Sequence, residues 1–203
     1  SPGVVVGSWS GTEKTFQRFL GPDYSISPAG FYLGGGGFTL AGPVVVGGHG
    51  YGMFIPETSS PLGSAAISGG GGAVQLGWAV IRRTDWLVYP YAAFGGTGFT
   101  ALVTNTSNTT MTIAPNETLA GGASTELQSG FFTMELGVGA QRLLLFGDGD
   151  SQGGFAIGAS GGFITRVIGG DITREERELA LPQSQLTGGY LRLHLGGGGF
   201  YVD

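Results

Sequence analysis

The sequence predicts an all-β fold, an up-and-down antiparallel β-barrel of about eight strands in a single domain that spans residues 1–203. Two observations support this prediction. Eight glycine-rich segments carry apolar side chains at every second position, which is typical of strands with one buried face. Short turns and long polar connections alternate between those segments, and an up-and-down barrel places its tight turns at one end and its long loops at the other.

The eight expected strands cover residues 4–10, 31–41, 44–55, 72–81, 86–103, 129–146, 155–168 and 189–202. Several of them are long enough to cross a bilayer, which takes about 9–11 tilted residues. Pro90 lies inside the fifth strand and has no backbone N–H. We therefore expect a bulge or a break there.

The alternation also predicts which face of each strand points outward, because a shift of one residue would exchange the two faces. The side chains expected on the outside are Leu136, Val138, Leu191, Leu193, Val74, Leu76 and Trp78. The side chains expected on the inside are Glu135, Arg192 and Gln75.

The connections fall into two groups. Short turns are expected at residues 41–43, 82–85 and 147–152, and long loops at residues 11–30, 56–69, 104–126 and 169–187. Two stretches inside the long loops, residues 11–20 and 171–181, have a pattern that would support a turn or two of helix. The second holds many charged residues, so we interpret it as a solvated loop.

Composition restricts the class of protein. Only 11% of the residues are charged, compared with about 25% in a typical soluble domain. A soluble monomer needs charge on its surface, so we expect much of this exterior to face lipid or other subunits. Hydrophobic residues make up 41% of the chain, which argues against disorder.

Other partners and cofactors are disfavoured by the same inventory. The net charge is −5 and no basic run is present, so binding to nucleic acid is not expected. The chain has no cysteine, which excludes disulfides and thiolate metal sites. No stretch of about 18 apolar residues would form a membrane-spanning helix.

With this loop rhythm and alternation, the whole chain resembles the small eight-stranded outer-membrane β-barrels of the outer-membrane protein A and W type. In that family an aromatic residue usually ends the last strand, and here Phe200 and Tyr201 are followed by Val202 and Asp203. The resemblance implies a bacterial outer-membrane location.

The resemblance also implies a polar network inside the barrel. The inward polar candidates are Glu135, Arg192, His194, Gln75 and Arg166, together with Gln141 and, if a bulge shifts its parity, Gln128. We expect Glu135 and Arg192 to pair across the interior, because an unpaired buried charge is costly. An ion pair of this kind is favoured over a proton or ion relay. So sparse an interior suggests a plugged barrel without an aqueous pore.

We expect no catalytic residues, no cofactor and no metal site. His49 and His194 are the only histidines, and neither has a carboxylate at metal-ligand spacing. Ser160 and His194 lie on neighbouring expected strands, so a lipid-modifying outer-membrane enzyme is kept as a minor alternative. Three sequons, at Asn105, Asn108 and Asn116, are candidate glycosylation sites in a polar surface loop.

Two main hypotheses on function follow. The first is a structural, non-catalytic barrel of the bacterial outer membrane or cell surface, with membrane lipid as its partner. The second is a self-assembling subunit of an extracellular filament or tube, in which copies of the chain cover one another's apolar exterior. The loop rhythm favours the membrane, whereas the charge-poor interior and the terminal Val202 and Asp203 favour the filament.

Overall fold

The computed structural model describes residues 2–8, 10–27, 29–83, 85–115, 117–146, 151–175, 177–181, 183 and 186–201. Its eight main strands are β1 (Pro2–Ser8), β2 (Ala29–Ala41), β3 (Val44–Ser59), β4 (Gly63–Trp78), β6 (Trp86–Asn105), β9 (Ser124–Phe146), β10 (Ser151–Arg174) and β12 (Thr187–Tyr201). Short strands are β5 (Ile81–Arg82), β7 (Met111–Ala114), β8 (Glu117–Leu119) and β11 (Arg177–Glu178). The helix α1 covers Ser10–Leu20.

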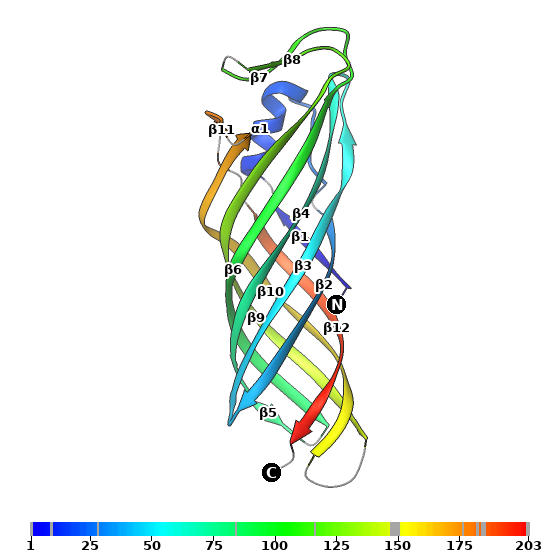
Figure 1. The fold of residues 1–203 in the computed structure, drawn as a ribbon, viewed down its shortest axis with the longest axis vertical. Helices are drawn as coiled ribbons and strands as arrows, with labels where there is room; N and C mark the ends of the chain where they lie inside the picture. The colour runs from blue at the N-terminus through cyan, green and yellow to red at the C-terminus, as the bar shows by residue number, and fades with distance from the viewer. Residues whose placement is uncertain are drawn as a thin grey trace.

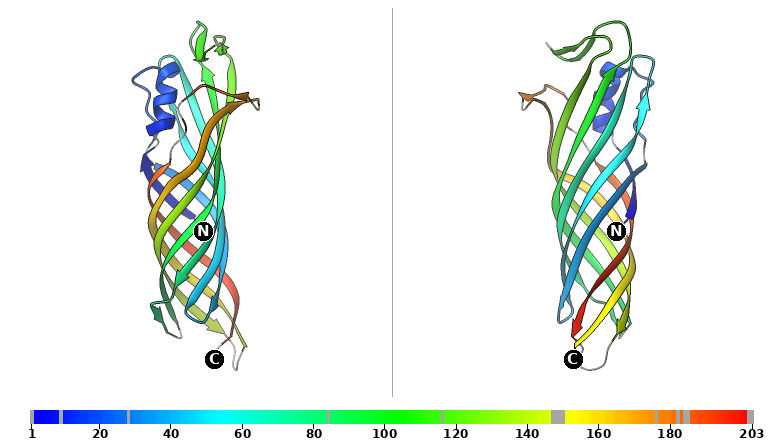
Figure 2. Two further views of the ribbon diagram at one scale, coloured as in Figure 1. Left: turned by 90° about the vertical axis from the view of Figure 1, so that its left-hand side faces the viewer. Right: turned by 45° about the vertical axis from the view of Figure 1, so that its right-hand side comes forward.

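The eight main strands form one antiparallel sheet in up-and-down order, as predicted. The order of neighbours is β1-β2-β3-β4-β6-β9-β10-β12, and every pair is antiparallel. The strands curve around a common elongated interior (Figure 1). The tight turn between β2 and β3 lies at one end, and α1 lies with the longer connections at the other (Figure 2).

The strand β1 joins the two ends of this sheet over a limited length. It pairs with β12 on one side and with β2 on the other, along Pro2–Ser8. Those partners are the halves of β2 and β12 nearest the long connections. At the level of β1, every main strand is therefore paired on both sides. Between β1 and the short-turn end, no described strand pairs with both β2 and β12.

One predicted loop, residues 56–69, is wrong. The strand β3 continues to Ser59 and β4 begins at Gly63, so only a short turn separates them. Pro56 lies within a register shift of the ladder between β3 and β4, between Ile55 and Thr58. Proline is tolerated at such irregularities. The expected turn at residues 147–152 lies largely outside the described residues.

The irregularity predicted at Pro90 is present on one side of the strand only, where pairing passes from β4 to β5 with a shift of one residue. The ladder between β6 and β9 runs without a shift through Pro90, which pairs with Val138. The ladder between β4 and β6 ends one residue away, at Gly77 and Tyr91. Pro90 thus lies where its missing N–H removes no bond to β4, so the strand has no need to bend.

The long connection before β2 contains a full helix where the sequence suggested a turn or two. Glu13 and Arg18 lie at the ends of α1 that suit their charges. Gly21 ends the helix at a φ of 98°, and its N–H donates to the carbonyl of Gln17. No described helix is long and apolar enough to span a membrane.

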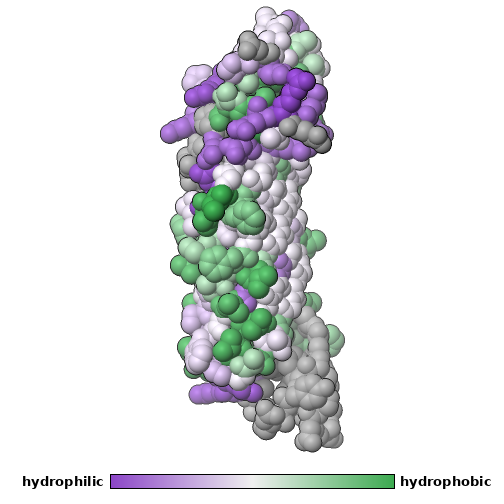
Figure 3. All heavy atoms as spheres, turned by 60° about the vertical axis from the view of Figure 1, so that its left-hand side comes forward, coloured by the Kyte–Doolittle hydropathy of each residue, from purple (hydrophilic) through white to green (hydrophobic). Residues whose placement is uncertain are grey.

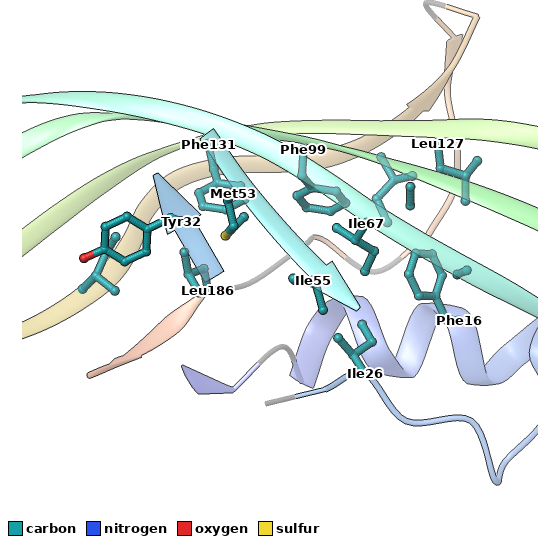
Figure 4. Close-up of a cluster of buried hydrophobic side chains, with 14 of the residues drawn as sticks. Phe16, Ile26, Tyr32, Met53, Ile55, Ile67, Phe99, Leu127, Phe131 and Leu186 are labelled. Atoms are coloured by element: carbon teal, nitrogen blue, oxygen red, sulfur yellow. The ribbon is translucent and has the colours of Figure 1, made fainter. Parts of the chain in front are cut away.

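The helix packs its apolar face into the end of the sheet. Phe16 of α1, and Ile26 in the segment after the helix, point toward Ile55, Ile67 and Leu127 (Figure 4). All five side chains are buried. This cluster is the largest apolar core of the molecule that the described residues provide, and it fills the interior next to the long connections.

The two faces of the sheet follow the predicted alternation. The seven side chains expected outside are all more than half exposed, from Leu136 and Val138 at 52% to Val74 at 64%. Glu135 and Arg192 are buried inside, and Gln75 is half-buried. Apolar side chains gather on the outer surface below a polar region that carries the long connections (Figure 3). The predicted register is therefore confirmed.

Candidate functional site

A polar cluster inside the sheet is the candidate site, and its centre is an ion pair. Arg192 Nη2 donates to Glu135 Oε1 at 2.7 Å. The two residues come from β12 and β9, which both pair with β10 and do not pair with each other. The side chains meet because both point inward from a strongly curved sheet. The ion pair expected from the sequence is present.

His49 joins this pair from β3. Its Nε2 lies 2.9 Å from Arg192 Nη1 and 3.4 Å from Glu135 Oε1. A guanidinium can only donate, so the shorter contact requires Nε2 to accept a hydrogen bond.

Tyrosine rings surround the guanidinium. Arg192 Nε donates to the hydroxyl of Tyr32 at 2.8 Å, and that hydroxyl donates to the carbonyl of Leu191. The ring centroids of Tyr190, Tyr32 and Tyr51 lie 4.3, 5.5 and 5.9 Å from Arg192 Cζ. These distances are within the range of cation–π attraction. Arg192 is thus held by a carboxylate, an imidazole and aromatic faces together.

Further hydrogen bonds between side chains extend the cluster along the interior. Tyr91 and Tyr190 share a hydroxyl contact of 2.6 Å, and Tyr51 contacts Thr97 Oγ1 at 2.7 Å. Nearer the short-turn end, Gln141 Nε2 donates to the hydroxyl of Tyr89 at 3.0 Å. Gln75 also hydrogen-bonds Tyr89, so this predicted inward glutamine does lie in the network.

The second histidine contacts the serine that was considered for nucleophilic catalysis. Ser160 Oγ and His194 Nε2 are 2.7 Å apart on the adjacent strands β10 and β12. Ser160 is 3% exposed. Glu135, the buried carboxylate of the interior, makes its short contacts with Arg192 and His49. The arrangement is a buried hydrogen bond within the wall, and a lipid would not reach the serine from outside.

Arg166 and Gln128 lie apart from the cluster. Arg166 Nη1 donates to the carbonyl of Gly169 and to Gln183 Oε1, so this side chain binds the long connection after β10. Arg166 lies just beyond the point where β10 stops pairing with β12, and just before a register shift in the ladder to β9. Gln128 is exposed. Simple alternation places Gln128 outside, as observed, since β9 has no bulge there to turn it inward. Alternation could not show that Arg166 reaches the connection after β10 instead of the central cluster.

Of the three sequons, the one at Asn105 lies in the interior of the folded protein. Its side chain is fully buried, and its amide donates to the carbonyls of Thr109 and Leu119 at 2.7 and 3.0 Å. Its Oδ1 accepts from the N–H and the hydroxyl of Ser107. Asn108 is exposed, and Asn116 lies outside the described residues.

Sequence reasoning missed most of the tyrosines and the role of His49. Tyr190 and Tyr32 share the inward parity of Arg192, which was the available signal. Parity could not show that β3 brings His49 to Glu135, because that contact depends on how the sheet curves.

The arrangement offers little to a metal ion or a cofactor. Among the described residues, no group of three or more His, Asp or Glu side chains is placed to hold a metal. Glu135 Oε2 is buried without a described hydrogen-bond partner. Comparison with protein-family models, curated proteins and solved structures finds no match for the chain.

Proposed function

We propose that this protein is a structural, non-catalytic β-barrel of the bacterial outer membrane, with the eight main strands curved around a plugged interior. The observation that carries the proposal is an inverted distribution of side chains. The buried face of the sheet holds an ion pair and hydrogen-bonded polar groups, and the exposed face holds large apolar side chains.

The apolar exterior is too extensive for a soluble monomer, which rarely exposes contiguous apolar patches above a few hundred Å². Outward Leu, Phe, Val and Ile side chains on β4, β6, β9, β10 and β12 are about half exposed or more. Trp78 and Trp86 are exposed near the tight turns, where an aromatic girdle would meet a membrane interface. The polar long connections would then lie in water.

The filled interior supports a structural role for the barrel and gives no support to a channel. The helix α1 fills the end near the long connections with apolar side chains. The centre of the interior is occupied by Arg192, Glu135 and tyrosine rings in mutual contact. Such tight mutual pairing stabilises one arrangement and leaves little freedom for proton transfer or substrate binding.

A second candidate is a filament subunit whose apolar exterior packs against copies of itself. The observation that favours it is the incomplete ladder beside β1, since free edges of a sheet can pair with other chains. Copies in a filament would also bury the exposed leucines and phenylalanines without lipid.

Cell fractionation distinguishes the two candidates. We expect the protein in the membrane fraction, soluble only with detergent, and resistant to extraction by high salt and alkaline carbonate. Electron microscopy of the culture medium provides the opposing result: fibres that contain the protein, with none in the membranes, would replace the first proposal by the second. Recovery as a soluble monomer would contradict both.

A further inference from the structure

An open depression lies on the outer face of the sheet, over the halves of β4, β6, β9 and β10 that are nearest the long connections. Its volume is about 700 Å³, which is within the range of small-molecule sites. The polar side chains that line it are Ser68, Thr100, Gln128, Thr173 and Asp171. We call this feature the outer depression.

Four of these polar side chains form a row across four strands. Ser68 pairs with Thr100, Thr100 pairs with Gln128, and Gln128 pairs with Thr173. Residues directly opposite each other in an antiparallel ladder share one face of the sheet, with Cβ atoms about 4.5–5.5 Å apart. Within the described part of the chain, the side chains of Ser68, Thr100 and Gln128 have no hydrogen-bond partner. The row therefore offers several polar groups to a ligand.

The row interrupts an outward face that is otherwise apolar. On β6 the nearest large outward side chains are Phe94 and Leu102, one on each side of Thr100, and both are exposed. Phe54, which pairs with Ser68, is exposed as well. Lipid tails or apolar protein against this row would leave its polar groups without hydrogen bonds, which is costly. A polar ligand would satisfy them.

Glycines make the floor of the outer depression flat. Gly98 pairs with Gly70 on one side and with Gly130 on the other. An added Cβ at Gly130 would meet no atom within 4 Å, and one at Gly98 would only touch the carbonyl of Ser129 at 3.6 Å. The fold would accept side chains at both positions, so the hollow exists because they are absent. Phe132, the next outward residue on β9, is exposed beside this floor.

A bulge in β10 brings a carboxylate to the outer depression. The pairing of β10 with β9 shifts between Gly169 and Ile172, and Asp171 lies within this shift. Gln183 Nε2 donates to Asp171 Oδ1 at 2.9 Å, and Arg166 Nη1 donates to Gln183 Oε1 at 2.9 Å. Neither Gln183 nor Arg166 lines the hollow, so they hold the carboxylate from beside it. Bulges commonly re-aim a side chain next to a functional site.

We propose that the outer depression binds a saccharide, an uncharged sugar unit rich in hydroxyl groups. Serine and threonine hydroxyls and the Gln128 amide both donate and accept, and the Asp171 carboxylate accepts. This mixture matches sugar hydroxyls, which also donate and accept. No lining residue is basic, so a phosphate or another anion would meet a carboxylate without any counter-charge.

The flat floor suits the apolar C–H face of a sugar ring, which could also contact Phe132. A free saccharide and the headgroup of a glycolipid offer the same chemistry to these residues. The site goes beyond the structural role proposed above and does not depend on a membrane.

Nuclear magnetic resonance on the ¹⁵N-labelled full chain tests the proposal in lauryldimethylamine oxide micelles, which contain no sugar. The sugar probes are maltose and dodecyl maltoside. The control probes are octaethylene glycol dodecyl ether, which has the same alkyl chain without a sugar, and choline chloride, which supplies an organic cation. Each is added to about 10 mM, where a site with a Kd of about 1 mM would be mostly filled.

We expect saturable shifts of the backbone amides of Gly98 and Gly130 and of the side-chain amide of Gln128. The amide of Gly161, in the middle of β10 and outside the lining, should not move. Shifts at the first three positions with an unchanged Gly161 would place the sugar in the outer depression.

Two variants test the same site by different means. Gly130→Leu fills the floor, and Gln128→Leu removes a polar group that is already exposed. Each should weaken binding of the sugar probe by at least about tenfold. The matched control is Gly35→Leu, because an added Cβ at Gly35 also meets no atom within 4 Å and β2 does not line the hollow. Thermal unfolding confirms that each variant is folded.

Shifts with maltose that are lost in Gly130→Leu and Gln128→Leu, and kept in Gly35→Leu, support the proposal with a free saccharide as ligand. The same pattern with dodecyl maltoside and not with maltose supports it with a glycolipid headgroup as ligand. Equal shifts with the ether detergent, shifts with choline in place of both sugar probes, or no shifts with either sugar probe overturn it.

Discussion

Arg192 and Glu135 form an ion pair across the interior of the sheet, with Nη2 and Oε1 2.7 Å apart. The side chains are 5% and 1% exposed. Burial of this kind makes each charge depend on the other, because a lone charge in the interior would lose its hydration without compensation. The pair therefore joins β9 to β12 across the strand that separates them.

Removal of the carboxylate should destabilise the protein strongly. We expect Glu135→Gln to lower the free energy of unfolding by about 3–5 kcal/mol, since it leaves Arg192 buried without a counter-charge. Urea unfolding in detergent, followed by tyrosine and tryptophan fluorescence, measures the change. Glu126→Gln is the matched control because Glu126 is exposed on the same strand. Equal effects of the two substitutions would show that the ion pair contributes nothing.

A charged side chain on the outward face should weaken membrane insertion where that face meets lipid. We expect Leu193→Arg to reduce membrane insertion by about 2–4 kcal/mol, the cost of an arginine near the bilayer midplane. Leu102→Arg is the control, since Leu102 is similarly exposed and lies near the long connections, where the expected cost is about 0–1 kcal/mol. Folding into lipid vesicles against urea measures both. Normal insertion of Leu193→Arg would contradict the membrane proposal.

Gly139 should be required for the position of a tyrosine ring. An added Cβ there would lie 2.6 Å from Tyr89 Cζ, and Tyr89 is buried and held by Gln141. We expect Gly139→Ala to cost about 1–3 kcal/mol through overpacking. At Gly96 an added Cβ meets open space, so Gly96→Ala should be close to neutral. Thermal unfolding compares the two. Similar midpoints would place the Tyr89 ring elsewhere.

Asn105 should hold the connection between β6 and β9. We expect Asn105→Ala to weaken this connection locally by about 1–3 kcal/mol, because it leaves the carbonyls of Thr109 and Leu119 without their donor. Faster proteolytic cleavage within residues 106–123 is the measurement. Asn108→Ala changes an exposed side chain in the same connection and should leave the cleavage rate unaltered. No difference between the two variants would exclude a structural role for Asn105.

Tyr24 should make the packing of α1 sensitive to alkaline pH. Burial, together with the nearby charge of Glu13, raises the pKa of Tyr24 from 10.0 to about 12. The folded state therefore favours the neutral phenol. Its contribution to stability should be complete below pH 10 and should be lost as the pH rises toward about 12. Unfolding measured between these pH values should show a loss that is smaller in Tyr24→Phe. An identical pH dependence would contradict this assignment.

Sequence by itself determined the faces of the strands and most of their boundaries. A period of two placed Glu135 and Arg192 inside and Leu191 and Leu193 outside, because a pleated strand alternates its side chains whatever its neighbours are. The predicted loop at residues 56–69 was wrong, because β3 continues past Pro56 through a register shift that alternation does not reveal. Alternation also fails beyond Arg166, where register shifts interrupt the ladder to β9.

Tertiary structure alone decided which inward residues meet and which outward residues line the outer depression. His49, Glu135 and Arg192 come from β3, β9 and β12, and their contact depends on the curvature of the whole sheet. The polar row that includes Thr100 and Gln128 likewise depends on the register between β6 and β9. Alternation reports the face of a residue but not its height or its partner across the interior, since those follow from the relative register of strands distant in sequence.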